Sequence, residues 1–269
     1  MNSFLVHFKA DARHFQLICL ASFLCLGIFS LGWAIHFYKY FLIFASVITF
    51  QIFFSKLENL PLDGIKSACI TGFGLSLLFH SSQPILYVAA AFFAIAGKFI
   101  FRYNGKHFIN PANLGICLTY IFFGNSWISP GQWGSSLFFL LVLSLAGMAV
   151  LYKARRIEVG VVFIIFYLAL EFSRNILYRG WPLDFFQHQF TNGALLLFSF
   201  FMITDPCSTP NHRGARVFFA IAVALLAFYL SSYKFVIGAP VWALFALCPL
   251  TPLLDKWFAS KRYYWLPSV

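Results

Sequence analysis

Charged residues are scarce in this chain, and acidic residues are the rarest of them. Only 10% of the 269 residues are Asp, Glu, Lys or Arg, and eight of these are acidic. A soluble domain typically carries about 25% charged residues. No polar stretch is long enough to fold as a separate soluble domain, so we expect a single membrane domain over residues 1–269.

Several motifs of enzymes and metalloproteins are also missing. The six cysteines form no CxxC pair and no Cys/His ligand spacing, which excludes a recognisable zinc site or disulfide framework. The sequence has neither a nucleophile elbow nor a phosphate-binding glycine loop. We therefore predict no catalytic residues and no metal ligands. The net charge of +11 does not indicate nucleic-acid binding, because the basic residues lie in short loops between apolar runs.

What the chain does have is apolar runs of membrane-spanning length. Hydrophobic residues make up 61% of it and its mean hydropathy is +0.81. Ten runs stand out: 15–37, 39–55, 65–82, 84–103, 109–124, 132–152, 157–177, 187–204, 215–232 and 237–256. In lipid, runs of this length satisfy their backbone only as helices. We predict an all-α polytopic membrane protein with about ten transmembrane helices.

The distribution of positive charge gives an orientation. If the N-terminus is inside and the chain crosses ten times, only four of the 19 Lys and Arg residues fall outside: Lys39, Arg174, Arg179 and Lys234. Cytoplasmic loops carry an excess of these residues. Both termini are therefore predicted to be cytoplasmic. Ten helices divide at the outside loop 125–131 into halves 1–126 and 127–269, which would form an inverted 5+5 repeat.

Two polar motifs fall on the predicted inside face. The first is KHFINPANLG at 106–115, in which Asn110 and Pro111 are a favoured cap and first residue of a helix. The second is FMITDPCSTPNHRGAR at 201–216, in which Asp205-Pro206 and Thr209-Pro210 form a rigid turn. Helix N-termini favour anions, but for a single cap of this kind we favour an ordinary cap beside positive-inside residues.

Together the two motifs predict one wall of a ligand or cofactor site. The candidate cofactor-binding residues are Lys106, His107, Asn110, Pro111, Asn113, Thr204, Asp205, Ser208, Thr209 and Arg213.

Both motifs resemble those of the NqrB/RnfD family. KHFINPANLG is similar to that family's KHIFNPA-type stretch, and FMITDPCSTPNHRGAR to its FMITDP…TTP…RGR stretch. Members of this family are flavin-carrying membrane subunits of the sodium-pumping NADH:quinone reductase and of the Rnf complex. The resemblance implies a bacterial inner-membrane subunit of a redox complex, with other subunits or redox proteins as partners and a flavin (FMN or riboflavin) as cofactor.

One departure from the family concerns the flavin linkage. Larger members attach FMN to a Thr in a stretch such as SGATPL, and the closest stretch here runs from Tyr178 to Asp184. Trp181 then stands at the position of the acceptor Thr, and Tyr178 at that of the Ser. Without the acceptor hydroxyl, we expect any flavin to be bound non-covalently.

One acidic residue lies within an apolar run, at Glu171, with Arg174 one turn on. An intramembrane acid is a candidate for a proton or cation path. A locally neutralised helix end is the interpretation we favour from the sequence.

The leading functional hypothesis is an electron-transport subunit. The alternatives are a small-solute or ion transporter on the same scaffold, and a cofactor-free membrane anchor for a redox partner.

Overall fold

The computed structural model describes residues 11–33, 36–128, 137–190 and 193–263, and these residues are mostly helical. The α-helices are α2 (Ala12–Phe29), α3 (Phe37–Leu57), α4 (Ile65–Leu78), α5 (Ile85–Ile100), α6 (Pro111–Phe123), α7 (Leu137–Ala154), α8 (Ile157–Phe172), α9 (Leu183–Phe190), α10 (Gly193–Leu197), α11 (Arg213–Ser232), α12 (Ala239–Leu247) and α13 (Leu250–Trp257). A short 3-10 helix, η1 (Leu62–Gly64), precedes α4, and π-helices η3 (Ser173–Tyr178) and η4 (Phe198–Met202) extend α8 and α10. The predicted all-α class is confirmed.

The first half of the chain forms one group of helices. In this group α2 packs on α4, α3 packs on α4 and α5, and α5 packs on α6. A Cβ atom added at Gly115 would lie 2.5 Å from the carbonyl oxygen of Ala90, so α5 and α6 approach closely at a residue with no side chain. This contact fixes the start of α6, where the first polar motif lies.

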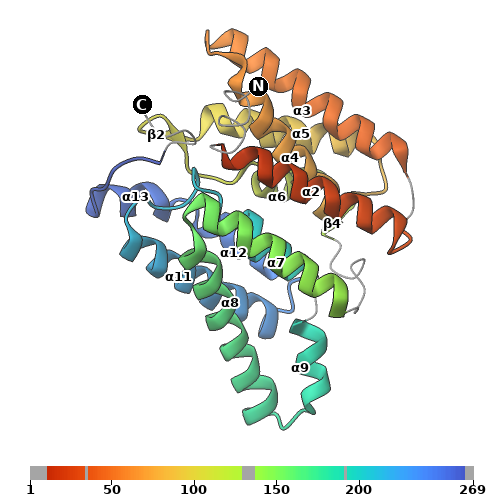
Figure 1. The fold of residues 1–269 in the computed structure, drawn as a ribbon, viewed down its shortest axis with the longest axis vertical. Helices are drawn as coiled ribbons and strands as arrows, with labels where there is room; N and C mark the ends of the chain where they lie inside the picture. The colour runs from red at the N-terminus through yellow and green to blue at the C-terminus, as the bar shows by residue number, and fades with distance from the viewer. Residues whose placement is uncertain (1–10, 34–35, 129–136, 191–192, 264–269) are drawn as a thin grey trace, which may run out of the picture.

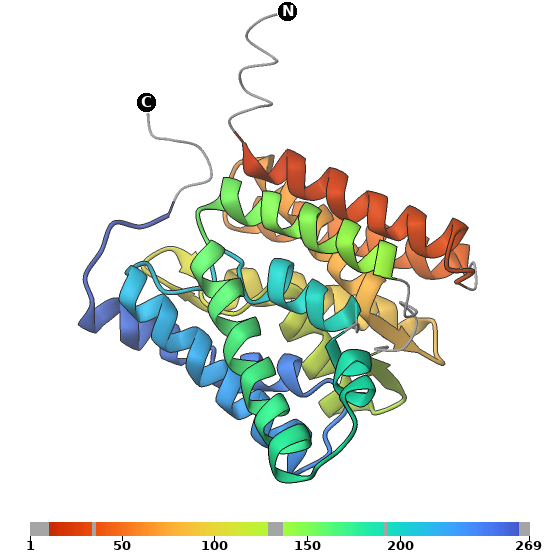
Figure 2. The same cartoon turned by 60° about the horizontal axis from the view of Figure 1, so that its bottom comes forward.

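The second half forms another group beside it. Here α7 packs on α10 and η4, α8 packs on η4 and α11, and α11 packs on α12. The two groups meet through α2 with α7 and through α6 with α12. In Figure 1 the red-to-yellow helices lie to one side and most of the green-to-blue helices to the other, and Figure 2 shows the green α7 running beside the red α2. Residues of both groups contribute to a single apolar core.

The described residues form two small sheets, one between distant segments and one within a hairpin. Strand β1 (Phe79–Ser81) pairs antiparallel with β4 (Ser126–Ile128), and β2 (Arg102–Tyr103) pairs with β3 (Lys106–His107). The β2–β3 turn is Asn104-Gly105, and both residues have positive φ, as a tight hairpin turn requires. This turn places Lys106 and His107 directly before α6.

Each predicted apolar run contains helix, but several runs differ from a single regular helix. Run 65–82 ends as helix at Leu78 and continues as β1. Run 237–256 is broken at Pro249, which separates α12 from α13. Run 187–204 contains the end of α9, then α10 and η4. Residues 34–35, 132–136 and 191–192 of the predicted runs, and 129–131 of the loop between the predicted halves, lie outside the described residues.

The helices suit a multi-pass membrane protein. Three of them, α2, α3 and α11, are long and apolar enough to cross a membrane by length and composition, and α5 and α6 are shorter apolar helices. Many large apolar side chains on the outer surface are exposed, among them Phe41 at 73%, Leu145 at 71% and Tyr152 at 77%. A surface of this kind faces lipid more readily than water.

Candidate functional site

The two asparagines of the first motif connect α6 to the second half of the chain. Asn110 caps α6 by accepting a hydrogen bond from the backbone N–H of Asn113, and Pro111 is its first residue. The side-chain amide of Asn110 donates to the carbonyl of Met202 at 3.1 Å, and that of Asn113 donates to the carbonyl of Val241 at 2.7 Å. Asn113 is fully buried. Both amides therefore bind backbone that lies about a hundred residues or more away.

The second motif forms a compact turn held by its own hydrogen bonds. The carbonyl oxygen of Asp205 accepts from the backbone N–H groups of Ser208 and Thr209, each at 3.1 Å. The hydroxyls of Ser208 and Thr209 donate to the same carbonyl. Just before the turn, the hydroxyl of Thr204 donates to the carbonyl of Phe200 at 2.6 Å. These hydroxyls are thus engaged within the turn.

Lys106 joins this turn to α13. Its ammonium lies 2.7 Å from Asp255 Oδ2, and it also donates to the carbonyl of Thr209 at 2.8 Å and to Asn211 Oδ1 at 3.2 Å. Burial lowers the pKa of Lys106, and the charge and hydrogen bond of Asp255 oppose that effect. The side chain is a structural cation with three acceptors rather than an open anion-binding group.

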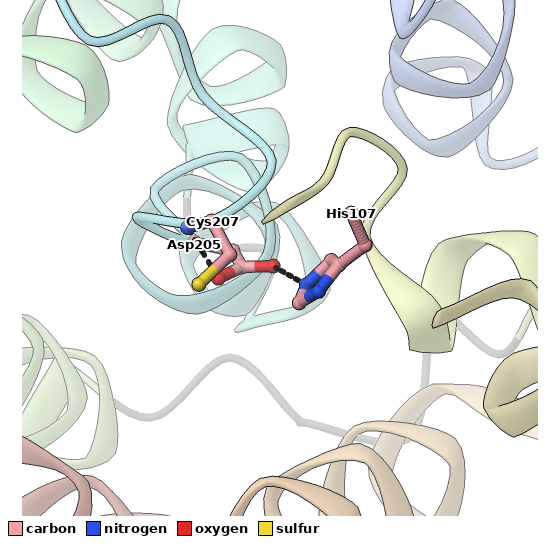
Figure 3. Close-up of side chains that lie close together, drawn as sticks. All are labelled: His107, Asp205 and Cys207. Atoms are coloured by element: carbon pink, nitrogen blue, oxygen red, sulfur yellow. Dashed lines mark hydrogen bonds and ion pairs between the residues drawn. The ribbon is translucent and has the colours of Figure 1, made fainter. Parts of the chain in front are cut away.

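His107, Asp205 and Cys207 lie together beside the turn (Figure 3). His107 Nε2 lies 3.4 Å from Asp205 Oδ2, and Asp205 Oδ1 accepts from the backbone N–H of Cys207 at 3.1 Å. Burial alone would raise the pKa of Asp205, but the hydrogen bonds and charge of His107 and the bond from Cys207 hold it below its usual value. The carboxyl is therefore ionised at neutral pH.

One ligand atom from each of these three side chains lies within 4.8 Å of the others, a spacing that a divalent cation could bridge. Lys98 lies within electrostatic reach of both Asp205 and Cys207, and Lys106 and Arg156 lie within reach of Cys207. These side chains already supply the positive charge that Asp205 requires, and they would repel an added cation. We assign no metal to the cluster.

The arginines of this region have different roles. Arg216 pairs with Glu158 of α8 and donates to the carbonyl of Asn211, which connects the turn to α8. Arg213 is exposed at the start of α11. Arg156 donates to the hydroxyl of Thr209 at 3.3 Å and stacks over the ring of Tyr263. The sequence motifs contain no signal for Arg156, Glu158 or Asp255, because each reaches the turn from a distant segment.

The structure brings most of the predicted residues together but leaves little space among them. The cavity next to the motifs has a volume of about 60 Å³. Of the predicted site residues, His107, Asn110, Pro111 and Asp205 line it, together with residues of α2, α4 and η4. Lys106, Asn113, Thr204, Ser208, Thr209 and Arg213 do not line it. We call this the inner cavity, and the end of the molecule where α6 begins the inner end.

Two larger cavities lie toward the opposite, outer end. One, of about 490 Å³, is lined by aromatic side chains that include Tyr120, Trp127 and Trp242, and by Lys234. The other, of about 310 Å³, is lined by residues that include Tyr167 and Ser231. Ile128, Val236 and Ile237 line both, so the two are adjacent. Sequence reasoning missed these cavities, because their aromatic residues resemble an ordinary interfacial belt.

The stretch that stands in place of a flavin attachment motif lies near the outer end of α8. Tyr178 is 86% exposed at the end of η3. Trp181 packs edge-on against Phe185, and the guanidinium of Arg179 lies over its ring. Neither an indole nor this exposed phenol reproduces the acceptor threonine.

Comparison with known proteins identifies the family. A sequence model of the NQR2, RnfD, RnfE family matches residues 127–264. The chain is 34% identical over 73 residues to the D-type subunit of the ion-translocating oxidoreductase complex of Stutzerimonas stutzeri, which is 27% of this chain and 21% of that protein. It is 31% identical over 71 residues to the corresponding protein of Halorhodospira halophila (strain DSM 244 / SL1), which is 26% of this chain and 20% of the relative. The aligned segments thus span about a fifth of each relative. The family match covers half of the chain, including the second motif, and this chain belongs to the NQR2, RnfD, RnfE family.

Proposed function

We propose that this protein is a membrane subunit of an ion-translocating oxidoreductase complex in a bacterial cytoplasmic membrane. The observation that carries the proposal is the family match over residues 127–264, together with the names of the relatives. The first motif lies outside that match, yet it binds the second motif directly through His107 with Asp205 and through Asn110 with Met202. The two motifs thus form one structural unit, as expected if they serve one function.

We further propose that the chain crosses the membrane ten times as two halves of opposite orientation. The order of packing supports this. In the first half the contacts run α2–α4, α3–α4, α3–α5 and α5–α6. In the second half α7 packs on α10 and η4, α8 packs on η4 and α11, and α11 packs on α12. The pairs are the same in both halves when α2, α3, α4, α5 and α6 are matched in order with α7, α8, α10 with η4, α11 and α12. Each half also has an irregular segment at its third helix, β1 in one and η4 in the other.

The fit of a flavin differs between the two ends. Ligand cavities usually measure about 300–1,000 Å³, so the inner cavity of about 60 Å³ does not accept an isoalloxazine ring. The hydrogen-bonding groups of the two motifs are also largely engaged with each other. The cofactor-binding role predicted for Lys106, His107, Asn110, Asp205 and their neighbours therefore finds no support in this geometry. Their contacts favour a structural role in joining the halves.

The larger outer cavity suits a planar cofactor better. Its volume of about 490 Å³ lies in the usual range, and Tyr120, Trp127 and Trp242 offer ring faces and edges against which a flavin could stack. Lys234 supplies a cation at its rim. We propose that a non-covalent flavin binds there. A bound flavin would supply one- and two-electron transfer, while the protein holds the ring and limits its contact with water.

The test is the flavin content of the purified protein. Chain purified from its native membrane in mild detergent should show a flavin absorption band, and acid precipitation should release the flavin into solution. Trp242→Ala should lower the bound flavin severalfold, because it removes a stacking surface. Trp257→Ala is the matched control, since that indole is 70% exposed on α13 and lines none of these cavities. Folded wild-type protein without flavin would refute the cofactor proposal.

A further inference from the structure

We propose that residues 256–262, together with the exposed face of α13, bind anionic phospholipid headgroups at the inner end of the molecule. This interaction surface is separate from the proposed redox function. Residues 256–262, which we call the basic segment, begin in the last turn of α13 and read KWFASKR. The basic segment carries three cations and no acidic residue, and every one of its residues is exposed.

One face of α13 is fixed to the turn of the second motif. The hydroxyl of Thr251, which is fully buried, donates to the carbonyl of Ser208 at 2.9 Å. Asp255 Oδ1 accepts from the backbone N–H of Asn211 at 2.7 Å, and Asp255 Oδ2 lies 2.7 Å from the ammonium of Lys106. In Figure 1 α13 lies at the edge of the molecule. Because this face is held by the protein, the opposite face of α13 has a fixed direction.

That opposite face combines apolar and basic side chains. Leu253, Lys256 and Trp257 are spaced by three and four residues, so they lie on the same side of the helix. Leu253 is 46% exposed and Trp257 is 70% exposed. The ring of Phe258, which follows, stacks on His212 with 5.5 Å between the ring centroids. Aromatic and aliphatic side chains beside cations suit the boundary between hydrocarbon and water better than either phase alone.

The charges of this surface are not neutralised by the protein. Within the described part of the chain, no carboxylate forms an ion pair with Lys256 or Lys261. Asp255, the acidic residue next to the basic segment, is buried against Lys106. Arg213, which follows the stacked histidine, is exposed and adds a further cation. Clusters of basic residues at the end of a membrane helix attract anionic lipid, so the charge is complementary to phosphate headgroups.

The basic segment is attached to the protein at both ends. At one end it continues from α13. At the other end the guanidinium of Arg262 donates to the carbonyl of Asn104 at 3.1 Å and to that of Gly105 at 2.7 Å. The ring of the next residue, Tyr263, lies against the guanidinium of Arg156, 4.8 Å from the ring centroid. These contacts hold the segment along the inner end, which lowers the entropy lost when a headgroup binds.

The size of the surface favours lipid over a protein partner. A stable protein interface buries about 1,200–2,000 Å² and involves about 20–30 residues a side. The large apolar side chains exposed on this surface are only Leu253, Trp257 and Phe258. Lysine is also depleted in protein interfaces. Binding of headgroups requires only an interfacial apolar anchor and cations near the phosphates, and this surface has both.

The test uses the full-length protein in nanodiscs and measures quenching of tryptophan fluorescence by brominated lipids. The contribution of Trp257 is the difference between wild-type protein and Trp257→Phe. In a phosphatidylcholine background, brominated phosphatidylglycerol should quench this contribution at least twofold more than brominated phosphatidylcholine at the same mole fraction. Raising the salt concentration from about 0.1 M to about 1 M should remove most of this excess, because the screening length falls from about 10 Å to about 3 Å.

Charge variants show whether the basic segment causes the excess. Lys256→Gln and Lys261→Gln should each lower it, and the two changes together should abolish it. Lys56→Gln is the matched control, because it removes a lysine that is exposed in the last turn of α3, and it should keep the wild-type excess. All three lysines are exposed, so the thermal midpoints of the variants should stay close to that of wild type.

Two results would overturn the proposal. Equal quenching of Trp257 by the two lipids would mean that this surface meets the membrane without a preference for anionic headgroups. Absence of quenching by either lipid would mean that water or a protein partner covers this face instead. The measurement needs neither a flavin nor an electron donor, so failure of the redox proposal leaves it unaffected.

Discussion

The ammonium of Lys106 and the carboxylate of Asp255 lie 2.7 Å apart with 5% and 6% of their side chains exposed. The pair joins β3, just before α6, to α13 at the inner end of the molecule. Arg102 and Glu58 form a pair of similar length, but their side chains are 29% and 39% exposed. The two pairs differ mainly in burial, which makes them a matched test of what the inner contact contributes.

Lys106→Met should destabilise the protein by about 3–5 kcal/mol, because it leaves Asp255 buried without its partner. Glu58→Gln should cost no more than about 1 kcal/mol, since exposed ion pairs contribute little. Unfolding of the detergent-solubilised variants by increasing denaturing detergent measures both. Equal losses in the two variants would mean that the buried pair is not a structural link.

Stability should fall in acid because of Asp205. Its pKa in the folded protein is lowered, with His107 and the N–H of Cys207 outweighing the effect of burial. The folded state thus binds the proton more weakly than the unfolded chain. The stabilisation is fully present above the ordinary Asp pKa of about 3.9 and is lost as the pH falls through the lower folded value.

Asp205→Asn should reduce this acid dependence while lowering stability at neutral pH. Thermal midpoints measured from pH 7 to below about pH 4 test it. Asp63→Asn is the control, because Asp63 is exposed in η1 and should leave the profile unchanged. A profile for Asp205→Asn that coincides in shape with wild type would contradict the assignment.

Gly115→Ala should separate α5 from α6. The new Cβ would lie 2.5 Å from the backbone oxygen of Ala90, which cannot rotate away, so a cost of about 1–3 kcal/mol is expected. Gly214→Ala provides the contrast: its Cβ would meet only the flexible ring of His212, at 3.3 Å. In the first turn of α11, alanine should be neutral or stabilising by up to about 1 kcal/mol. Denaturation of the two variants side by side decides the question.

The proposed topology predicts which ends face the cytoplasm. Fusions of a reporter that fluoresces only in the cytoplasm should be bright after Arg155 and after Lys261, and dark after Asn125 and after Lys234. A reporter active only outside the cytoplasm should give the opposite pattern. A bright fusion after Lys234 would refute ten crossings with an inverted second half.

Much of the fold could be predicted from the sequence, because local properties decide it. Apolar runs of membrane-spanning length form helices, since lipid leaves no other partner for the backbone. Asn110 and Pro111 start α6 as their capping and φ preferences require. The breaks within runs were harder to predict. The chain leaves the helix after Leu78 because β1 pairs with β4, about fifty residues away.

The site depended on tertiary structure for a physical reason. Asn110, Asn113 and Lys106 were recognisable as polar residues at a helix start, but their partners Met202, Val241 and Asp255 are separated from them by 92 residues or more. Hydrogen-bonding capacity is visible in a sequence, whereas its satisfaction depends on which distant groups the fold brings near. For the same reason the residues predicted to form a pocket wall largely bind one another, and the cavity beside them measures about 60 Å³.

Glu171 illustrates both sides of this division. The sequence determined that an acidic residue lies within an apolar helix, and that such a residue needs a partner. Its spacing from Arg174 suggested a local ion pair, but side-chain direction and the packing of α8 on α11 gave Glu171 the neutral groups of Asn175 and Ser232, and gave Arg174 the ring of Tyr233. Local chemistry set the need for polar partners, and only the folded arrangement of helices decided which groups provide them.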